Sequence, residues 1–176
     1  MPSYSIIENF EVHKNNRFLE IAESLKPELR HKEIKAAKEI MVGKDRQMRT
    51  VITEEYPIEN LYAKSLKRDD TVFVDFGDHA VGYVTLELSK TGSHQDAPVY
   101  FYLKFGERLE EMTDKTADYD GWLSRGWIQE EYIHVDVLPA KVKLPRRYSF
   151  RYMELRVIDT SAKFQLKIDG ISCDTV

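Results

Sequence analysis

Cysteine is almost absent from this sequence of 176 residues, because Cys173 is its only instance. A single thiol excludes a disulfide bond within the chain, so the protein can fold in a reducing compartment. Long apolar runs are also missing, since no segment approaches the ~20 apolar residues of a membrane-spanning helix. The first ten residues lack the basic and apolar regions of a secretory signal. These absences predict a cytoplasmic protein with no membrane partner.

Charge of one sign is not in large excess, because 26 Lys and Arg residues stand against 30 Asp and Glu residues. The net charge of -4 gives no positive field, which predicts that the protein has no nucleic-acid partner. Phosphate-binding loops, dinucleotide-binding glycine patterns, nucleophile elbows and paired cysteines are also absent from the sequence. We therefore expect no cofactor. The length is sufficient for one sizeable domain with an extension.

The first 70 residues predict a helical extension followed by a linker. Asn15 or Asn16 can cap a first helix, which Pro27 ends. The apolar residues that recur there at helical spacing are Phe18, Ile21, Ala22 and Leu25.

A second, highly charged helix is expected over residues 28–41, with Gly43 as its stop. Its apolar side would consist of Ile34, Ala37 and Met41. Periodicity fades between residues 44 and 70, where residues 49–53 could form a short strand. We interpret this stretch as a connection.

From residue 71 to residue 176 the pattern becomes that of a mainly β domain. Val84, Leu86 and Leu88 alternate with their neighbours as in a strand with one buried face and one wet face. Several such segments without helical periodicity between them predict an antiparallel β-sandwich or jelly roll. Gly92 and Gly170 are expected at turns or bulges. The predicted strands cover residues 71–76, 83–89, 99–105, 131–137, 148–159 and 164–171.

The segment 146–157 changes its phase of alternation. Its early aromatic residues, Tyr148, Phe150 and Tyr152, point one way, whereas Met153, Leu155 and Val157 occupy the alternate positions. This change predicts a strand whose early half buries one face and whose later half buries the other, as when a strand bends or passes between two sheets. The residues expected in the core are Tyr148, Phe150, Val84, Leu86, Phe101 and Leu103.

Three segments, taken in order, resemble the amino-terminal β-sandwich of bacterial α-L-rhamnosidases and their relatives. They are DFGDHAVGYVTLEL, YLKFGERLEE and RRYSFRYMELRV. The resemblance covers roughly residues 71–176 and contains strands and turns without a catalytic signature. In that family, catalysis belongs to a toroid of about a dozen helices after the sandwich, which needs ~200 further residues. The resemblance therefore implies a non-catalytic domain with no catalytic residue, and a catalytic toroid as a possible partner.

The long interval between residues 107 and 130 is the candidate binding site, because loops of this length are usually functional or carry local structure. Proteins bind sugars by stacking aromatic rings on the apolar face and pointing polar groups at the hydroxyl rim. We predict ligand contact by Tyr119, Asp120, Trp122, Arg125 and Trp127. The same cluster also contains Asp114, Asp118 and Gln129. The alternative is that both Trp rings plug one end of the sandwich.

Other polar groups carry weaker patterns. Asp118, Asp120 and Gly121 resemble the start of a calcium loop, but the rest of that pattern is missing, so an acidic turn is expected. His134 and Asp136 share one face of a strand, yet two groups are too few for a metal site. We therefore predict no metal.

Three glutamates, Glu107, Glu110 and Glu111, follow a predicted strand. A carboxylate pair for glycoside hydrolysis must be held about 5 to 9.5 Å apart across a cleft, and sequence does not establish such a separation. A solvated charge run is the expected arrangement.

Two functions from different classes follow. The first is a carbohydrate-recognition or accessory module that binds a rhamnose-containing carbohydrate through the loop. The second is a structural domain that packs on a catalytic partner or forms a homodimer and binds no sugar. Exposed Trp rings would favour the first function, whereas buried rings and a large apolar patch elsewhere would favour the second.

Overall fold

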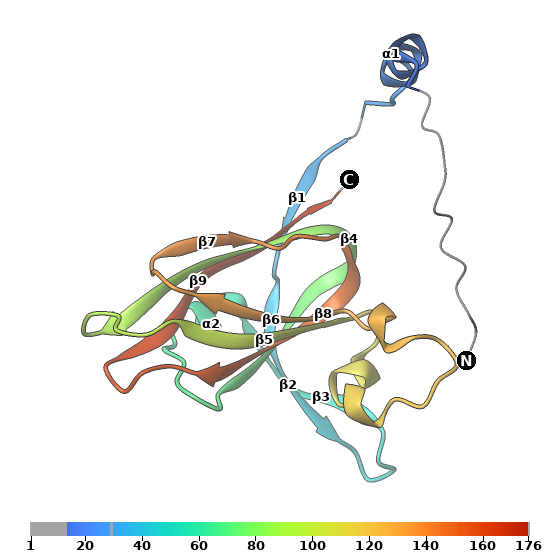
Figure 1. Ribbon diagram of the computed structural model, residues 1–176. Helices are drawn as coiled ribbons and strands as arrows, with labels where there is room; N and C mark the ends of the chain where they lie inside the picture. The colour runs from blue at the N-terminus through green and yellow to red at the C-terminus, as the bar shows by residue number, and fades with distance from the viewer. Residues whose placement is uncertain (1–13, 29, 176) are drawn as a thin grey trace, which may run out of the picture.

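Antiparallel strands dominate the computed structural model, which describes residues 14–28 and 30–175 (Figure 1). The described residues form one hydrogen-bonded sheet of nine strands. The mainly β, antiparallel fold predicted from the sequence is confirmed. The strands are β1 Lys32–Lys35, β2 Lys38–Lys44, β3 Thr50–Pro57, β4 Thr71–Gly92, β5 Val99–Gly106, β6 Glu130–Val135, β7 Ala140–Lys143, β8 Tyr148–Asp159 and β9 Phe164–Thr175.

Strand β4 folds this sheet into two layers. Its first half, up to Gly82, pairs with β2 and β8, and β8 pairs onward with β5, which pairs with β6. Its second half, from Gly82, pairs with β9 and β7, and β9 pairs onward with β1. The two predicted strands at residues 71–76 and 83–89 are therefore parts of one long strand. A strand that contributes to both layers is a common way to close a sandwich.

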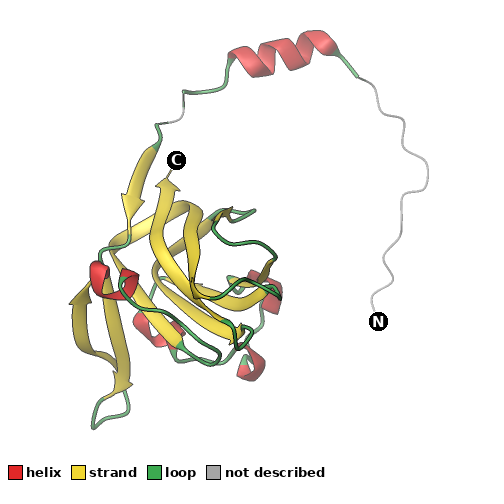
Figure 2. Ribbon diagram, turned by 90° about the vertical axis from the view of Figure 1, so that its left-hand side faces the viewer, coloured by secondary structure: helices red, strands yellow, loops and turns green. Residues whose placement is uncertain are grey.

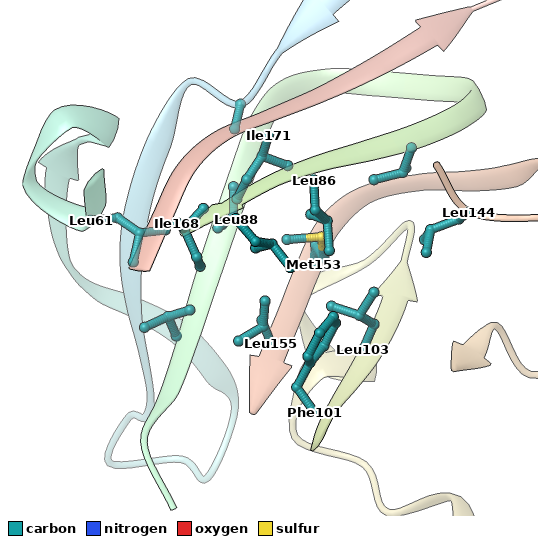
Figure 3. Close-up of a cluster of buried hydrophobic side chains, with 14 of the residues drawn as sticks. Leu61, Leu86, Leu88, Phe101, Leu103, Leu144, Met153, Leu155, Ile168 and Ile171 are labelled. Atoms are coloured by element: carbon teal, nitrogen blue, oxygen red, sulfur yellow. The ribbon is translucent and has the colours of Figure 1, made fainter. Parts of the chain in front are cut away.

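The core fills the space between these layers (Figure 3). Leu86 and Leu88 of β4 and Ile168 of β9 face Leu103 of β5 and Leu155 of β8, and all five belong to one buried cluster. The six residues predicted to be in the core are buried in the structure, each with no measurable exposure: Tyr148, Phe150, Val84, Leu86, Phe101 and Leu103.

The bend of β4 depends on glycine at two positions. Gly77 adopts a φ of 83°, which other residues rarely adopt, and its N–H donates to the carboxylate of Asp75 at 2.7 Å. At Gly82, where β4 changes partners, a Cβ atom would lie 2.2 Å from the carbonyl oxygen of Asp174. Only a residue without a side chain permits so close an approach of β4 and β9.

The predicted glycine turns also occur. Gly92 ends β4 with a φ of 97°. Gly170 lies beside an irregularity in the pairing of β4 with β9, where Asp169 has no partner residue between Gly170 and Ile168. A single unpaired residue of this kind is a β-bulge.

The phase change predicted in β8 is confirmed, because its buried positions shift from even to odd residue numbers between Tyr152 and Met153. Phe150 before the change and Met153 after it both lie in the same core cluster. The pairing of β8 with β4 is irregular at the same place, between Asp75 and Ala80. Both halves of β8 therefore face the core through different alternate positions, and β4 is the strand that passes between the layers.

The N-terminal region confirms one predicted helix and contradicts the other. Helix α1, Asn16–Ser24, begins after Asn15, whose side chain accepts hydrogen bonds from two backbone N–H groups. The helix predicted over residues 28–41 is wrong, because this stretch contains β1 and the start of β2. Met41, expected on an apolar helix side, is 49% exposed.

The predicted linker is also more ordered than expected. The short strand predicted at residues 49–53 is found as β3, and it is followed by the short helix α2, Ile58–Tyr62. Hydrogen bonds cross the predicted domain boundary between residues 70 and 71, since β1 pairs with β9 and β2 with β4. The division into residues 1–70 and 71–176 remains a prediction. The first ten residues lie outside the described part of the chain.

Candidate functional site

The loop between β5 and β6, residues 107–129, contains the predicted binding residues. The structure describes all of this loop, and three short 3-10 helices lie in it (Figure 1): η1 Leu109–Met112, η2 Thr116–Asp118 and η3 Arg125–Trp127. Met112 is buried in a small apolar cluster with Ile40 and Tyr152 on the outer face of the sheet. This contact anchors the first part of the loop.

Hydrogen bonds fix the loop at several further points. The buried Lys104 of β5 donates through Nζ to the carbonyl oxygen of Asp114 at 2.5 Å, and the Thr116 hydroxyl donates to Glu130 of β6. At the end of the loop, the Gln129 amide donates to the carbonyl of Ser149 at 2.8 Å and accepts from its N–H at 2.7 Å. These hydrogen bonds therefore hold the loop in place against β5, β6 and β8.

Both tryptophan rings of the loop lie in solvent. Trp122 is 92% exposed and Trp127 is 75% exposed. Ser124 shapes the turn between them, because its Oγ accepts from Gly126 N–H at 3.2 Å and its carbonyl accepts from Trp127 N–H at 3.0 Å. The alternative that these rings plug the end of the sandwich is wrong. Exposing two indole rings to water is unfavourable, and packing within the domain does not explain their positions.

A cleft of about 620 Å³ lies between this loop and the outer face of β5. Of the five predicted residues, Tyr119 and Asp120 line it, whereas the two Trp residues and Arg125 lie on the exposed surface of the loop. The full lining consists of Lys104, Glu111, Thr113, Asp114, Lys115, Thr116, Asp118, Tyr119, Asp120 and Ile128. Asp114 and Asp118 from the predicted cluster also line the cleft. Sequence reasoning missed several other lining residues, among them the buried Lys104.

Arg125 and Tyr119 have roles within the loop itself. The Arg125 guanidinium donates through Nη2 to the carbonyls of Ala117 at 3.2 Å and Tyr119 at 3.1 Å. The Tyr119 ring packs over Gly121, where a Cβ atom would lie 2.2 Å from the Tyr119 hydroxyl. Arg125 thus braces the backbone on which Tyr119 is held, and Gly121 leaves room for the ring.

The glutamates after β5 are engaged in local contacts. Glu107 Oε1 accepts from the Ser149 hydroxyl at 2.5 Å and lies 3.4 Å from His79 Nε2. These partners hold the pKa of Glu107 below its ordinary value, so its carboxylate is ionised near neutral pH and is a poor proton donor. The Glu110 carboxylate lies 3.4 Å from Nε of Arg108, and the Glu111 carboxylate accepts from the backbone N–H of Arg108 at 2.8 Å. This arrangement fits the predicted charge run.

His134 and Asp136, the weak candidates on β6 and just after it, have ordinary surface environments. The ring of His134 stacks on Tyr100, with centroids 3.9 Å apart, and Asp136 follows the end of β6. Within residues 14–28 and 30–175, no three His, Cys, Asp or Glu side chains gather in a group that could hold a metal ion. No helix in the same residues is both long and apolar enough to span a membrane.

Residues 38–175 match the model of the glycosyl hydrolase family 78 α-rhamnosidase N-terminal domain. The chain belongs to this family. The resemblance inferred from its three strand segments is confirmed, and the family 78 match begins at the start of β2. It includes the β5–β6 loop.

A solved structure described as a rhamnosidase from Klebsiella oxytoca with rhamnose bound is similar to this family 78 domain, with 34% sequence identity and a TM-score of 0.83. The similarity covers 93% of this chain and 32% of that chain. The chain therefore spans about a third of the length of the rhamnosidase. Among the curated proteins compared, none matches the chain.

Proposed function

We propose that this family 78 N-terminal domain is a non-catalytic accessory module that binds carbohydrate at the surface of the β5–β6 loop. The exposure of Trp122 and Trp127 is the observation that supports this function best. A large ring left in water beside a cleft is available to stack on the apolar face of a sugar. The expected ligand is a rhamnose-containing oligosaccharide, because the rhamnosidase relative is described with rhamnose bound.

The polar groups beside these rings suit the hydroxyl rim of a sugar. Asp118 and Asp120 line the cleft and offer carboxylate oxygens that accept hydrogen bonds from hydroxyls, while the Tyr119 hydroxyl can donate or accept. Arg125 contributes indirectly, since it holds the carbonyl of Tyr119. The proposed contact set is therefore an aromatic stacking surface with acceptors at its edge.

The contact free energy of a shallow stacking surface only slightly exceeds the entropic cost of ordering the ligand, so we expect weak binding. Millimolar affinity, about -4 kcal/mol, is the expected scale. The test is an NMR titration of the whole chain with a rhamnose-containing oligosaccharide. Trp122→Ala or Trp127→Ala should abolish the sugar-induced shifts while the spectrum of the free protein stays dispersed.

Val137→Ala is the matched control, because Val137 is 71% exposed and lies outside the loop. This variant should bind like the parent protein. Loss of binding only in the Trp variants would support the loop site. Absence of shifts in the parent protein would contradict the proposed function.

The exposure of helix α1 favours a second function, which is contact with a catalytic toroid of the kind found in rhamnosidases. The helix stands away from the sandwich in both views (Figures 1 and 2), and none of its described residues is buried. The exposed apolar side chains of the helix and of the residue that follows it are Phe18, Leu19, Ile21 and Leu25. Exposed apolar surface of this kind is typical of interaction sites. Phe18→Asp should weaken binding of an added toroid domain and leave the sugar titration unchanged, and equal toroid binding by both proteins would contradict this function.

A further inference from the structure

A strip of four aromatic rings crosses the outer face of β5 and β6. Tyr100 pairs with His134 across the two strands, and Tyr102 pairs with Tyr132. The ring centroids are 3.9 Å apart in the first pair and 5.1 Å apart in the second, and Tyr100 and Tyr132 connect the pairs at 6.3 Å. Alternate residues of β5, such as Phe101, point to the core. The aromatic strip therefore lies on the face opposite the core.

The rings of the aromatic strip differ in exposure. Tyr132 is 58% exposed and His134 is also exposed, whereas Tyr102 is 6% exposed and lies under the guanidinium of Arg156 at 5.0 Å. Cross-strand aromatic pairs stabilise a sheet by about 0.2–1 kcal/mol, which explains a pair that is partly covered. It does not explain why Tyr132, a large ring that contacts two others in the strip, remains open to solvent.

The aromatic strip is continuous with the cleft beside the β5–β6 loop. Glu130 joins them, because it accepts from the Tyr102 hydroxyl at 2.6 Å and from the hydroxyl of Thr116, which lines the cleft. Lys104, two residues along β5 from Tyr102, also lines the cleft. The four steps from Tyr100 to Lys104 correspond to ~13 Å along an extended strand. That length exceeds a single sugar ring.

The charges along this surface disfavour an acidic ligand. Beside the strip, Lys104 lies opposite Glu130 on β6 and Glu154 on β8, and Arg156 lies opposite Tyr102. The two positive and two negative charges balance. The cleft adds further carboxylates, which are Glu111, Asp114, Asp118 and Asp120, against Lys115. A polyanion would be repelled there. A neutral ligand with apolar faces and many hydroxyls fits both the rings and the polar edge.

We propose that the aromatic strip and the cleft form one elongated binding surface for a neutral oligosaccharide, with one sugar ring stacked on Tyr132 and the following rings lying along β5 and in the cleft beside Lys104. This inference rests on the proposed carbohydrate-binding function and extends it from the Trp residues of the loop to the sheet. The aromatic strip would then determine which length of oligosaccharide the domain prefers. A monosaccharide contacts one part of the surface, whereas an oligosaccharide contacts both.

The test is a pair of NMR titrations of the whole chain, one with L-rhamnose and one with a rhamnose-containing trisaccharide. Tyr132→Ala should bind the trisaccharide about tenfold more weakly, as expected for the loss of one aromatic stacking contact. Its affinity for L-rhamnose should be unchanged. Tyr132→Phe keeps the ring and should bind like the parent protein. Tyr83→Ala is the matched control, because Tyr83 lies on β4 in the other layer, next to Lys143.

The outcomes separate the two proposals. No shifts with either sugar in the parent protein would overturn both. Trisaccharide binding that Trp122→Ala weakens and Tyr132→Ala leaves unchanged would overturn the elongated surface and keep the loop site. Shifts at Tyr132 with a proline-rich peptide, but not with the trisaccharide, would overturn the oligosaccharide as occupant and assign the strip to a peptide. A dispersed spectrum of Tyr132→Ala ensures that lost binding does not reflect unfolding.

Discussion

Among the charged residues in the described part of the chain, Asp75 is the most buried. It is 2% exposed, and its two carboxylate oxygens accept from Nε and Nη2 of Arg151, each at 2.9 Å. Burial raises the pKa of this carboxyl, but the hydrogen bonds from Arg151 and from Gly77 N–H outweigh burial and hold the pKa below its ordinary value. The bend of β4 is thus fixed by a paired buried charge.

Replacing Arg151 by Met should destabilise the protein by about 3 kcal/mol, because a buried charge left without its partner is costly. Urea denaturation at neutral pH measures this difference. The folded pKa of Asp75 is depressed, so its pairing stabilises the fold above the ordinary pKa of 3.8 and is lost as the pH falls through the lower folded value. The difference between variant and parent should therefore shrink in acid. A difference independent of pH would contradict this account of Asp75.

Phe150 provides the corresponding test of the core. It is fully buried, and its ring lies edge-on to Phe76, with centroids 4.9 Å apart, and to Phe105 at 5.0 Å. Phe150→Ala should cost about 3–5 kcal/mol in the free energy of unfolding. The same substitution at Phe18, which is 68% exposed in α1, should change stability by less than about 0.5 kcal/mol. An equal loss of unfolding free energy at both positions would contradict the burial of Phe150 in the core.

At the level of elements, sequence patterns predicted the strands from residue 71 onward, with the exception of β7. Alternation is unambiguous where one face is buried over many residues, as in the second half of β4 and the start of β9, and Asn15 marked the start of α1. The helix predicted at residues 28–41 failed because its few apolar residues fit a period of two as well as a period of 3.6. Ala36 and Ile40 are the buried ones. Pairing of β1 with the end of β9 is a long-range contact that no local pattern contains.

The crossing of β4 and β9 gives a prediction at this scale. Gly82→Ala would place a Cβ atom 2.2 Å from the backbone of Asp174, so the strands must separate, at a cost of about 1–3 kcal/mol. Gly126→Ala is the control, since its nearest neighbour would be the Ser124 hydroxyl at 3.4 Å. Thermal unfolding of both variants measures the contrast. A Gly82→Ala protein as stable as the parent would contradict the close approach.

For the whole molecule, the site predicted from the sequence remains a prediction, and the structure brings only part of its residues to the cleft beside the β5–β6 loop. The spacing of Trp122 and Trp127 is visible in the sequence, and their exposure is not, because exposure depends on how η3 folds. Lys104 was missed since a charged residue inside an apolar strand reads as solvent-facing, although it is 5% exposed. Arg125 was expected to meet a ligand, and its contacts with loop carbonyls emerge only from the folded backbone.

The chain by itself should have no glycosidase activity. The family 78 match covers the N-terminal domain alone, and Glu107 is held by Ser149 and His79 as an ionised group. Incubation of the pure protein with an aryl α-L-rhamnoside is the measurement, with release of the aryl group as the signal. Turnover above buffer that a Glu107→Gln substitution abolishes would contradict a non-catalytic role.

The central claim is that the tryptophan rings of the β5–β6 loop contact a sugar, and the side-chain N–H signals of the two Trp residues test it most directly. Both rings are exposed, so both signals should be sharp in the free protein. On addition of a rhamnose-containing oligosaccharide, at least one should shift and saturate in the millimolar range. Two Trp signals that remain in place at saturating oligosaccharide, while the protein stays folded, would contradict the claim.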